Sequence, residues 1–381
     1  MYREAIRQTL EQADVQQRRR RLQPTENSRL DFCSNDYLGL SQDLHVMAAF
    51  QRGLKQWGCG ATASPLVRGY SSAHHHLAEY LADWLGMEHV LLFNSGFAAN
   101  SGVLQALQTV SLHPVLDRLA HASLYDAVQA GRLSRFRHND YTHLQSILAQ
   151  QVETTVVVTE SIFSMDGDGV SLADITPIAR AFDSVLMIDD AHGFGILGDD
   201  GCGMRGNTQG QHIDVLTATF GKACGIGGAF VATSADIADL CLQRCPHFIY
   251  STAFSAAQAV AILAAIERIR YTPELRLQLQ RNVNDYQQLL RSAGLKACTH
   301  SHPIQPLMVG CNEHAVRLAK AMQQQGIDCI AIRPPTVPQG TARLRVSIRA
   351  NHTRSDLERF VSRLVHCLHN DRELADVMYR Q

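Results

Sequence analysis

Lys222 has a sequence context suited to covalent chemistry, and the chain has only four lysines against 31 arginines. It follows an apolar run, DVLTATF (214–220), and lies among the glycines of TFGKACGIGG. Glycines there let the backbone turn tightly and let a small molecule approach closely. A lysine in a partly desolvated pocket has a lowered pKa and can form a Schiff base with a carbonyl cofactor. A surface lysine at a strand end explains this segment equally well when the segment is taken alone.

Two carboxylates, Asp189 and Asp190, end a second apolar run, SVLMIDD (184–190), and His192 comes three residues after Asp189. Neighbouring strand residues point to opposite sides, so one carboxylate can enter a pocket while the other caps the following turn. A buried carboxylate needs a cationic partner, and a pyridinium nitrogen supplies one. The spacing fits a metal pair or a hydrogen-bonded turn as well.

A third segment, FNSGFAAN (93–100), has the pattern of a strand end followed by a helix start. In that geometry the free N–H groups of Gly96 and Phe97 point at an anion, and the helix dipole adds to the attraction. Thr219, three residues before Lys222, can offer a hydroxyl to the same anion. A capped helix start without a ligand is the simpler interpretation of this motif alone.

Together these features match the needs of pyridoxal 5'-phosphate. That cofactor must have its aldehyde bonded, its ring nitrogen kept protonated and its phosphate bound. A nicotinamide cofactor leaves the lysine unexplained, and the glycine-containing run at 58–63 follows a helix instead of a strand. No metal site is predicted, because Cys241 and Cys245 have no second close pair beside them.

The elements that must position these residues form an α/β fold. Between about 42 and 270, helical periods alternate with short apolar runs, which indicates a mostly parallel sheet covered on both faces. Ligands bind at the carboxyl ends of the strands in such sheets. We expect an N-terminal arm (1–41), a large cofactor-binding domain (42–275) and a smaller C-terminal α+β domain (276–381). The expected strands are at 89–94, 154–161, 184–190, 214–220 and 227–234 in the large domain, and at 304–310, 327–333 and 342–348 in the small one.

Composition excludes several classes of protein. The chain is 45% hydrophobic and 19% charged, with a formal net charge of -1, so it can bury a large core and has no global field for nucleic acid. The N-terminal residues lack the apolar core of a signal peptide, and no segment reaches the ~18 apolar residues of a membrane span. We therefore expect a cytoplasmic protein whose ten cysteines are reduced.

Longer motifs extend these observations to a family. The chain resembles the α-oxoamine synthases, which implies fold type I of the pyridoxal-phosphate enzymes, the aspartate aminotransferase-like fold. The resemblance runs from the arm to the last domain, in order. It is carried by SNDYLGLS (34–41), NSGFAAN (94–100), HASLYDA (121–127), SIFSMDGD (161–168), DDAHGFGILG (189–198), TFGKACG (219–225) and RPPTVPQGTARLR (333–345). Within the family, IYST (249–252) resembles the biotin-pathway member.

The resemblance implies a role for each matched position around the cofactor ring. Lys222 would bond the aldehyde and act as acid and base at the substrate α-carbon, while Asp189 would pair with the ring nitrogen. His121 would stack on the ring and contact substrate. Ser164 and His192 would hydrogen-bond the phenolic side of the ring.

Phosphate and substrate contacts are implied in the same way. Gly96, Phe97 and Thr219 would bind the phosphate. Ser251 and Thr252 would reach the phosphate of a neighbouring subunit, which implies a homodimer with shared active sites.

Arg345 would grip the carboxylate of the amino-acid substrate, with Asn35 near it and Thr336 in contact with substrate. Arg18 is the preferred acyl contact, although Arg18 to Arg21 offer four registers.

Decarboxylative condensation of an amino acid with an acyl thioester is the activity that the family implies. The C-terminal motif RPPTVPQGTARLR most resembles that of the biotin-pathway member of the family. That member uses L-alanine and a pimeloyl thioester carried by coenzyme A or an acyl carrier protein. The alternatives are a sister enzyme such as glycine C-acetyltransferase, an aminotransferase on the same fold and a non-catalytic cofactor-binding protein. Phe194, Arg68 and Tyr125 depart from the family pattern and leave the acyl-chain preference open.

Overall fold

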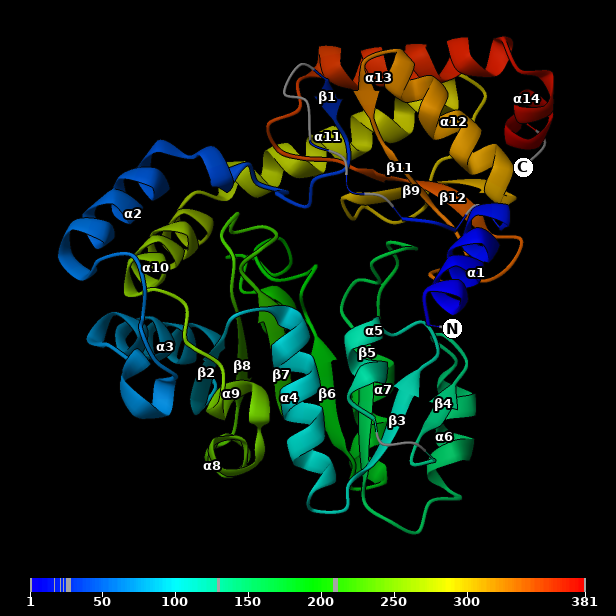
Figure 1. Ribbon diagram of the computed structural model, residues 1–381. Helices are drawn as coiled ribbons and strands as arrows, with labels where there is room; N and C mark the ends of the chain where they lie inside the picture. The colour runs from blue at the N-terminus through cyan, green and yellow to red at the C-terminus, as the bar shows by residue number, and fades with distance from the viewer. Residues whose placement is uncertain are drawn as a thin grey trace. The chain divides into compact units, whose positions relative to one another are not determined.

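Two compact units make up the chain in the computed structural model, which describes residues 2–16, 18–20, 22, 24, 29–128, 131–207 and 212–379 (Figure 1). The large unit comprises Asn35–Ser164 and Asp168–Leu277. The small unit comprises Met1–Ser34, Met165–Gly167 and Gln278–Gln381, so the N-terminal segment is grouped with the C-terminal residues.

A seven-stranded sheet forms the centre of the large unit. Across the sheet the order is β2 (His89–Phe93), β8 (Ala229–Thr233), β7 (Val215–Thr219), β6 (Val185–Asp189), β5 (Thr155–Glu160), β3 (His113–Asp117) and β4 (Ser134–Phe136). Every pairing from β7 to β4 is parallel, and β8 alone runs against both of its neighbours. The carboxyl ends of β5, β6 and β7 therefore meet at one edge, where such sheets bind ligands.

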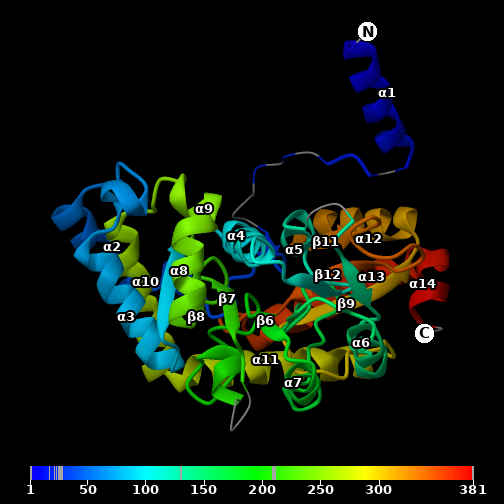
Figure 2. The same cartoon turned by 90° about the horizontal axis from the view of Figure 1, so that it is seen from below.

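Helices cover both faces of this sheet. α4 (Gly96–Gln108) and α8 (Ala235–Arg244) lie on one face and α7 (Leu172–Ala181) lies on the other (Figure 2). The core between α4 and the sheet is apolar, with Val103, Leu107 and Val158 buried in it. The remaining helical elements are η1 (Leu40–Gln42), α2 (Leu44–Trp57), η2 (Pro65–Gly69), α3 (Ser72–Leu85), α5 (Ala122–Asp126), α6 (Tyr141–Leu148), η3 (Gly203–Asn207), α9 (Pro246–Ile249) and α10 (Ala256–Tyr271).

The small unit has an antiparallel three-stranded sheet in the order β11 (Ile330–Ile332), β12 (Ala342–Ser347) and β9 (Ile304–Gly310). A second short ladder joins β1 (Leu30–Asp31) to β10 (Ile327–Asp328). Its helices are α1 (Tyr2–Val15), α12 (Asn312–Gln324), α13 (Arg354–His369), α14 (Arg372–Tyr379) and most of α11 (Pro273–Ser292). Across both units, none of the described helices is long and apolar enough to cross a membrane.

The expected fold class is confirmed, and each expected strand is found within two residues of its predicted start, although the segment 327–333 is split into β10 and β11. Three observed strands were not predicted: the two-residue β1 of the small unit, and β3 and β4 of the large sheet. β3 begins HP and β4 has three residues with an exposed arginine in the middle, so neither gives an apolar run. Both are recognised only by pairing, since β3 joins β4 to β5.

A tight turn after β7 holds the backbone of Lys222. The Gly225 N–H donates to the Lys222 carbonyl oxygen at 2.9 Å, and the Ile226 N–H donates to the Phe220 carbonyl oxygen at 2.9 Å. Gly225 has a φ of +69°, and a Cβ there would overlap the backbone of Ser41. Both the conformation and the close approach require glycine at this position.

We expect Gly225→Ala to lower the free energy of unfolding by about 1–3 kcal/mol, because it adds strain and a steric overlap. It should also reduce the cofactor content of the purified protein. Gly227→Ala is the matched control, since a Cβ there meets only the Gln258 side chain at 3.5 Å. Urea unfolding and cofactor absorbance would measure both effects, and equal behaviour of the two variants would contradict the prediction.

Candidate active site

A cavity of about 210 Å³ lies in the large unit, at the carboxyl ends of β5, β6 and β7 and the N-terminus of α4. Seven of its ten lining residues are predicted site residues, and the other three, Asn100, Glu160 and Ala191, are not. The predicted residues that line it are Gly96, Phe97, His121, Asp189, His192, Thr219 and Lys222. Residues from five separate segments of the sequence therefore meet here.

Asp189 is the last residue of β6, and its side chain is held by hydrogen bonds from one side. Asn100 Nδ2 donates to Asp189 Oδ2 at 2.6 Å, and the Ala191 N–H donates to Oδ1 at 2.9 Å. The residue is 5% exposed. A buried carboxylate that accepts two N–H donors is prepared to face a cation.

Asp190 takes the opposite direction, as the alternation of a strand requires. It is fully buried, it does not line the cavity, and its Oδ2 accepts the Met204 N–H at 2.8 Å. Burial raises the pKa of Asp190 to about 7. Of the two acids, Asp189 thus belongs to the cavity and Asp190 to the turn that follows.

His121 is the N-cap residue of α5, and its ring lines the cavity. The Ser123 N–H donates to His121 Nδ1 at 3.3 Å, and the Ser123 hydroxyl lies 2.8 Å from the same nitrogen. Burial lowers the pKa of His121; Asp189 raises it and Lys222 lowers it further. His121 is therefore a neutral imidazole at neutral pH.

Glu160 is a site residue that sequence reasoning missed. It ends β5, it is 2% exposed, and it stands in register with Asp189 of β6. Its Oε1 accepts the backbone N–H of His121 at 2.5 Å. Burial, reinforced by the charge of Asp189, raises the pKa of Glu160 well above its usual range. The signal available in the sequence is the acid that closes the apolar run TTVVVTE (154–160).

The N-terminus of α4 closes another side of the cavity. Ser95 is its N-cap, and its hydroxyl accepts the Ala98 N–H at 3.2 Å. Gly96 and Phe97, the first two residues of the helix, line the cavity together with Thr219. The Thr219 hydroxyl donates to the Gly228 carbonyl oxygen at 2.9 Å. Unpaired helix N–H groups and the helix dipole make this end suitable for a phosphate.

Tyr37 is a second residue that sequence reasoning missed. It links the predicted residue Asn35 to His192, which lines the cavity. Its hydroxyl lies 2.6 Å from His192 Nδ1 and donates to Asn35 Oδ1 at 3.3 Å. Tyr37 is fully buried. Asn35 does not line the cavity but is linked by this tyrosine to His192, which does.

Other predicted residues are not among those that line the cavity. Ser164, Ser251 and Thr252 belong to the large unit, and the Thr252 carbonyl oxygen accepts Asn94 Nδ2 at 2.5 Å. Arg18, Thr336 and Arg345 belong to the small unit. Arg345 is buried and donates to the Ser347 hydroxyl at 3.0 Å, Thr336 is exposed, and Arg18 donates to the Gln16 side chain at 3.1 Å.

The departures from the family pattern lie in different environments. Phe194 is buried in an aromatic cluster with Trp84, Phe220 and Phe230, at ring-centroid distances of 5.6, 6.4 and 5.0 Å. It therefore packs in the core and does not line the cavity. The Tyr125 hydroxyl donates to the Asp117 carbonyl oxygen at 3.0 Å, and Arg68 is exposed in η2.

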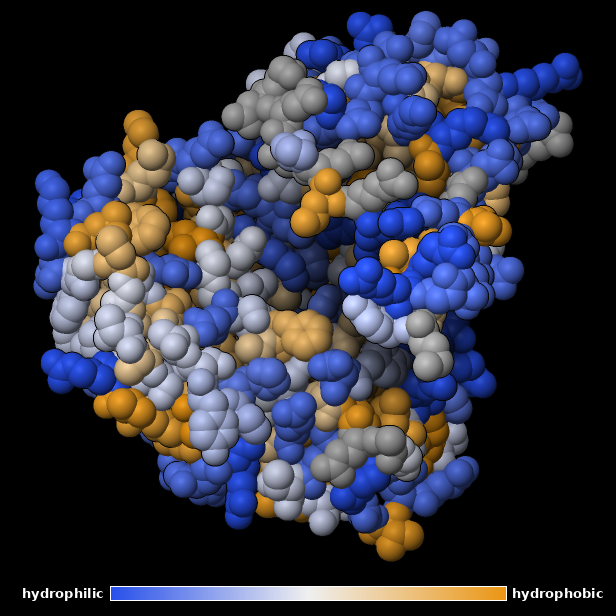
Figure 3. All heavy atoms as spheres, in the orientation of Figure 1, coloured by the Kyte–Doolittle hydropathy of each residue, from blue (hydrophilic) through white to orange (hydrophobic). Residues whose placement is uncertain are grey.

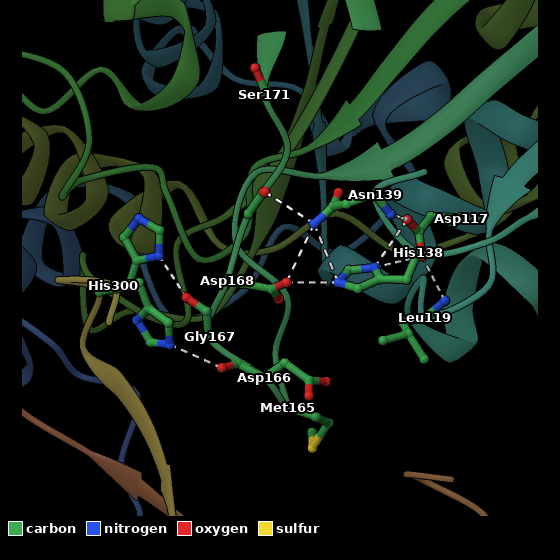
Figure 4. A network of polar contacts seen from close by, with 12 residues as sticks. Asp117, Leu119, His138, Asn139, Met165, Asp166, Gly167, Asp168, Ser171 and His300 are labelled. Carbon is green, nitrogen blue, oxygen red and sulfur yellow. Dashed lines mark hydrogen bonds and ion pairs between the residues drawn. The ribbon is translucent and has the colours of Figure 1, made fainter. Parts of the chain in front are cut away.

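A charged network follows the neighbouring strand ends (Figure 4). Asp117, the last residue of β3, lies 3.0 Å from His138 Nδ1, and Asp168 lies 2.8 Å from His138 Nε2. Asp117 also accepts the N–H groups of Leu119 at 2.8 Å and Asn139 at 3.0 Å. Burial by itself lowers the pKa of His138, but its hydrogen bonds to the two carboxylates outweigh burial and raise it to about 10. His138 is thus an imidazolium between two carboxylates.

Within the small unit, residues 165–167 are held by polar contacts of their own. Arg343 Nη1 donates to Asp166 Oδ1 at 2.5 Å. His300 Nε2 lies 3.1 Å from the Asp166 carbonyl oxygen, and His302 Nδ1 lies 2.6 Å from the Gly167 carbonyl oxygen (Figure 4). Among the described residues of both units, no cluster of three or more His, Cys, Asp or Glu side chains could hold a metal ion.

The donor set of the cavity fits pyridoxal 5'-phosphate. A lysine amine, a buried carboxylate held by two donors, a neutral imidazole and a helix N-terminus with a threonine beside it all line one volume. The lysine suits the aldehyde of the cofactor and the carboxylate suits its ring nitrogen. The imidazole suits the ring face, and the helix N-terminus with its threonine suits the phosphate. With a mostly parallel sheet beneath, this is the architecture of the fold type I pyridoxal-phosphate enzymes.

Comparison with known proteins gives a family of aminotransferase-like enzymes and, within it, a narrower group of relatives. The family model for aminotransferases of class I and II matches residues 27–364. A relative from Cronobacter sakazakii named 8-amino-7-oxononanoate synthase is 45% identical over 337 residues, which cover 88% of each chain. A relative of the same name from Serratia proteamaculans is 42% identical over 374 residues, covering 94% of this chain and 97% of that one.

Solved structures agree with this assignment. A serine palmitoyltransferase from S. paucimobilis with bound PLP–myriocin aldimine has a TM-score of 0.85 at 26% identity, over 90% of this chain and 88% of that chain. An 8-amino-7-oxononanoate synthase from Francisella tularensis has a TM-score of 0.78 at 24% identity, over 91% and 100%, and shows the fold. The chain belongs to the aminotransferase class I and II family and, within it, to the 8-amino-7-oxononanoate synthases, so the predicted family is confirmed.

The His138 network should make stability depend on pH. A pKa raised by folding stabilises the native state fully below the unfolded value of about 6.5, and this stabilisation is lost as the pH rises towards 10. The stability lost in His138→Asn relative to the parent should therefore shrink between pH 7 and pH 10 in urea unfolding.

His113→Asn is the control, because burial lowers the pKa of His113, which stays neutral over this range. A difference between His138→Asn and the parent that stays constant with pH would contradict a charged His138.

Glu160, whose raised pKa favours the protonated form, should tolerate replacement by a neutral amide. Glu160→Gln keeps an acceptor for the His121 N–H, so we expect cofactor affinity within about threefold of the parent, less than 1 kcal/mol. Glu160→Ala leaves that N–H without its acceptor and should cost about 1–3 kcal/mol of unfolding free energy. Asp189→Asn, which removes the charge facing the cavity, should lose most cofactor affinity. Equal losses in Glu160→Gln and Asp189→Asn would show that Glu160 is ionised.

Proposed function

We propose that this chain condenses L-alanine with a pimeloyl thioester to give 8-amino-7-oxononanoate, carbon dioxide and the free thiol carrier, in biotin biosynthesis. The observation that carries the proposal is that Lys222, Asp189 and His121 line one cavity in a chain that is 45% identical to a protein named for this product. Pyridoxal 5'-phosphate is the cofactor. When bound, it supplies an aldehyde that bonds an amine and a protonated ring that accepts electrons from the substrate α-carbon.

The residues of the cavity divide the work among them. Lys222 Nζ removes the α-proton of alanine and later returns a proton to that carbon, the role of a positioned acid and base. Asp189, whose carboxylate accepts from Asn100 and Ala191, would pair with the ring nitrogen and favour its protonated form. The α4 N-terminus and Thr219 hold the phosphate.

The acyl half of the reaction needs a hydrogen-bond donor. His121 lines the cavity as a neutral imidazole and can donate to the oxygen that becomes negative when the α-carbon attacks the thioester. The thiol then leaves with a proton, and the alanine carboxylate leaves as carbon dioxide. Arg345 binds that carboxylate before it leaves, with Asn35 near it and Thr336 beside the substrate. Ser164 and His192 contact the phenolic side of the cofactor.

A homodimer is part of the proposal, with Ser251 and Thr252 reaching the phosphate of the partner. An apolar face on α2 supports it. Leu44, Met47 and Phe50 are 81%, 45% and 37% exposed, and apolar side chains gather over this helix in Figure 3. Apolar patches of this kind mark interaction surfaces. We further propose a cytoplasmic enzyme with Arg18 as an acyl contact. Coenzyme A and an acyl carrier protein both remain candidates for the thioester carrier.

Titration of the visible absorption of the cofactor-loaded protein tests the substrate. We expect the strongest response to L-alanine over glycine and L-serine, and release of free thiol when a pimeloyl thioester is added. Lys222→Ala should lose turnover by at least about 10²-fold, because acid–base catalysis at the α-carbon is removed. Lys320→Ala, an exposed lysine of α12, is the control. Preference for glycine would move the chain to a sister activity, and substantial turnover by Lys222→Ala would remove the lysine from its role.

A further inference from the structure

A directed series of hydrogen bonds runs along the wall of the cavity from Thr217 of β7 to the His121 ring. It starts at Thr217, whose hydroxyl donates to Asn100 Oδ1 at 2.5 Å. Because that oxygen is used, the amide nitrogen of Asn100 must face the other way. Its two N–H groups then donate to Asp189 Oδ2 at 2.6 Å and to Ser123 Oγ at 3.0 Å. Thr217, Asn100 and Ser123 are each at most 3% exposed, so water does not compete for these bonds.

The next bond in the chain fixes the direction at histidine. Ser123 Oγ accepts from Asn100, so its own hydrogen can point to His121 Nδ1, 2.8 Å away. The Ser123 backbone N–H donates to the same nitrogen at 3.3 Å. The backbone N–H, which can only donate, requires Nδ1 to be unprotonated, and the hydroxyl can then donate to the same nitrogen. The ring proton of a neutral imidazole therefore lies on Nε2.

We propose that Asn100 and Ser123 are positioning residues that hold His121 as the Nε2–H tautomer while Asn100 also holds the carboxylate of Asp189. This inference rests on the proposed function for its catalytic meaning, and on hydrogen-bond direction alone for the tautomer. The result is a ring whose Nε2 is a donor and whose orientation is set from α4.

The hydrogen bonds made at position 100 require an asparagine. It must present one acceptor to Thr217 and two donors, one to a carboxylate and one to a hydroxyl, and a primary amide does both. An aspartate in its place would put a second carboxylate against Asp189. The two groups expected on the ring nitrogen and the ring face of the cofactor are therefore oriented by one side chain. The backbone of His121 is held separately, by Glu160.

Nitrogen NMR of the full-length chain labelled with 15N-histidine tests the tautomer, with and without pyridoxal 5'-phosphate. His121 can be assigned by the signal that disappears in His121→Asn. We expect Nε2–H in the parent protein in both states. Ser123→Ala removes a donor to Nδ1, and the ratio of the two tautomers should shift by about fivefold, which corresponds to one hydrogen bond of about 1 kcal/mol. Asn100→Ala should shift the ratio in the same direction and also weaken cofactor binding.

Ser101→Ala is the matched control. The Ser101 hydroxyl is fully buried on α4 and donates to the Ser123 carbonyl oxygen at 2.9 Å, so its loss disturbs the same residue without touching the chain to His121. An Nδ1–H tautomer in the parent overturns the proposal even if no variant folds. An unchanged ratio in Ser123→Ala, or an equal shift in Ser101→Ala, also overturns it. If the protein binds no cofactor but shows the expected tautomers, the proposed function is refuted and this inference still holds.

Discussion

A buried carboxylate at the end of β6 is the constraint on which the rest of the site depends. The Asp189 carboxylate is only 5% exposed, and burial opposes a charge there. Two donors, Asn100 Nδ2 and the Ala191 N–H, offset that cost. Because a carboxylate only accepts, Asp189 fixes the direction of the Asn100 amide, and Thr217 on β7 donates to the amide oxygen on its other side. The charge on one side chain thus determines which residues stand on α4 and β7.

Three neighbouring parallel strands end in an acid, and the three acids differ in their hydrogen-bond partners. Asp117 of β3 receives the His138 imidazolium and two backbone N–H groups. Asp189 of β6 receives two N–H donors, whereas the donor found for Glu160 of β5 among the described residues is the His121 N–H. Because the register places Glu160 beside Asp189, both cannot hold a charge cheaply, and the acid with fewer donors takes the proton.

The sequence predicts much of this, and the limits of prediction have physical causes. Apolar runs between turn formers give five strands of the large sheet, and the acid, lysine and glycine at their ends give the cofactor residues found in the cavity. β3 and β4 were missed because neither has an apolar run. Asn100, Glu160 and Tyr37 were missed because each acts through a residue distant in sequence, and only strand register and helix packing bring the pairs together. The aromatic surroundings of Phe194 could not be predicted for the same reason, since its partners come from α3, β8 and the end of β7.

Functional residues of this site therefore fall into two kinds with different sequence signals. Those proposed to bind the cofactor lie at strand ends and at helix starts, where backbone geometry exposes them and local motifs indicate them. Those that set the state of the first kind lie inside elements, such as Asn100 on the second turn of α4 and Thr217 in the middle of β7, and look like core positions. Such interior polar residues are costly unless every donor and acceptor is paired, and a substitution at one end of the chain leaves a buried partner unsatisfied at the other. For that reason the direction of each hydrogen bond, more than the list of residues around the cavity, determines what the site can do.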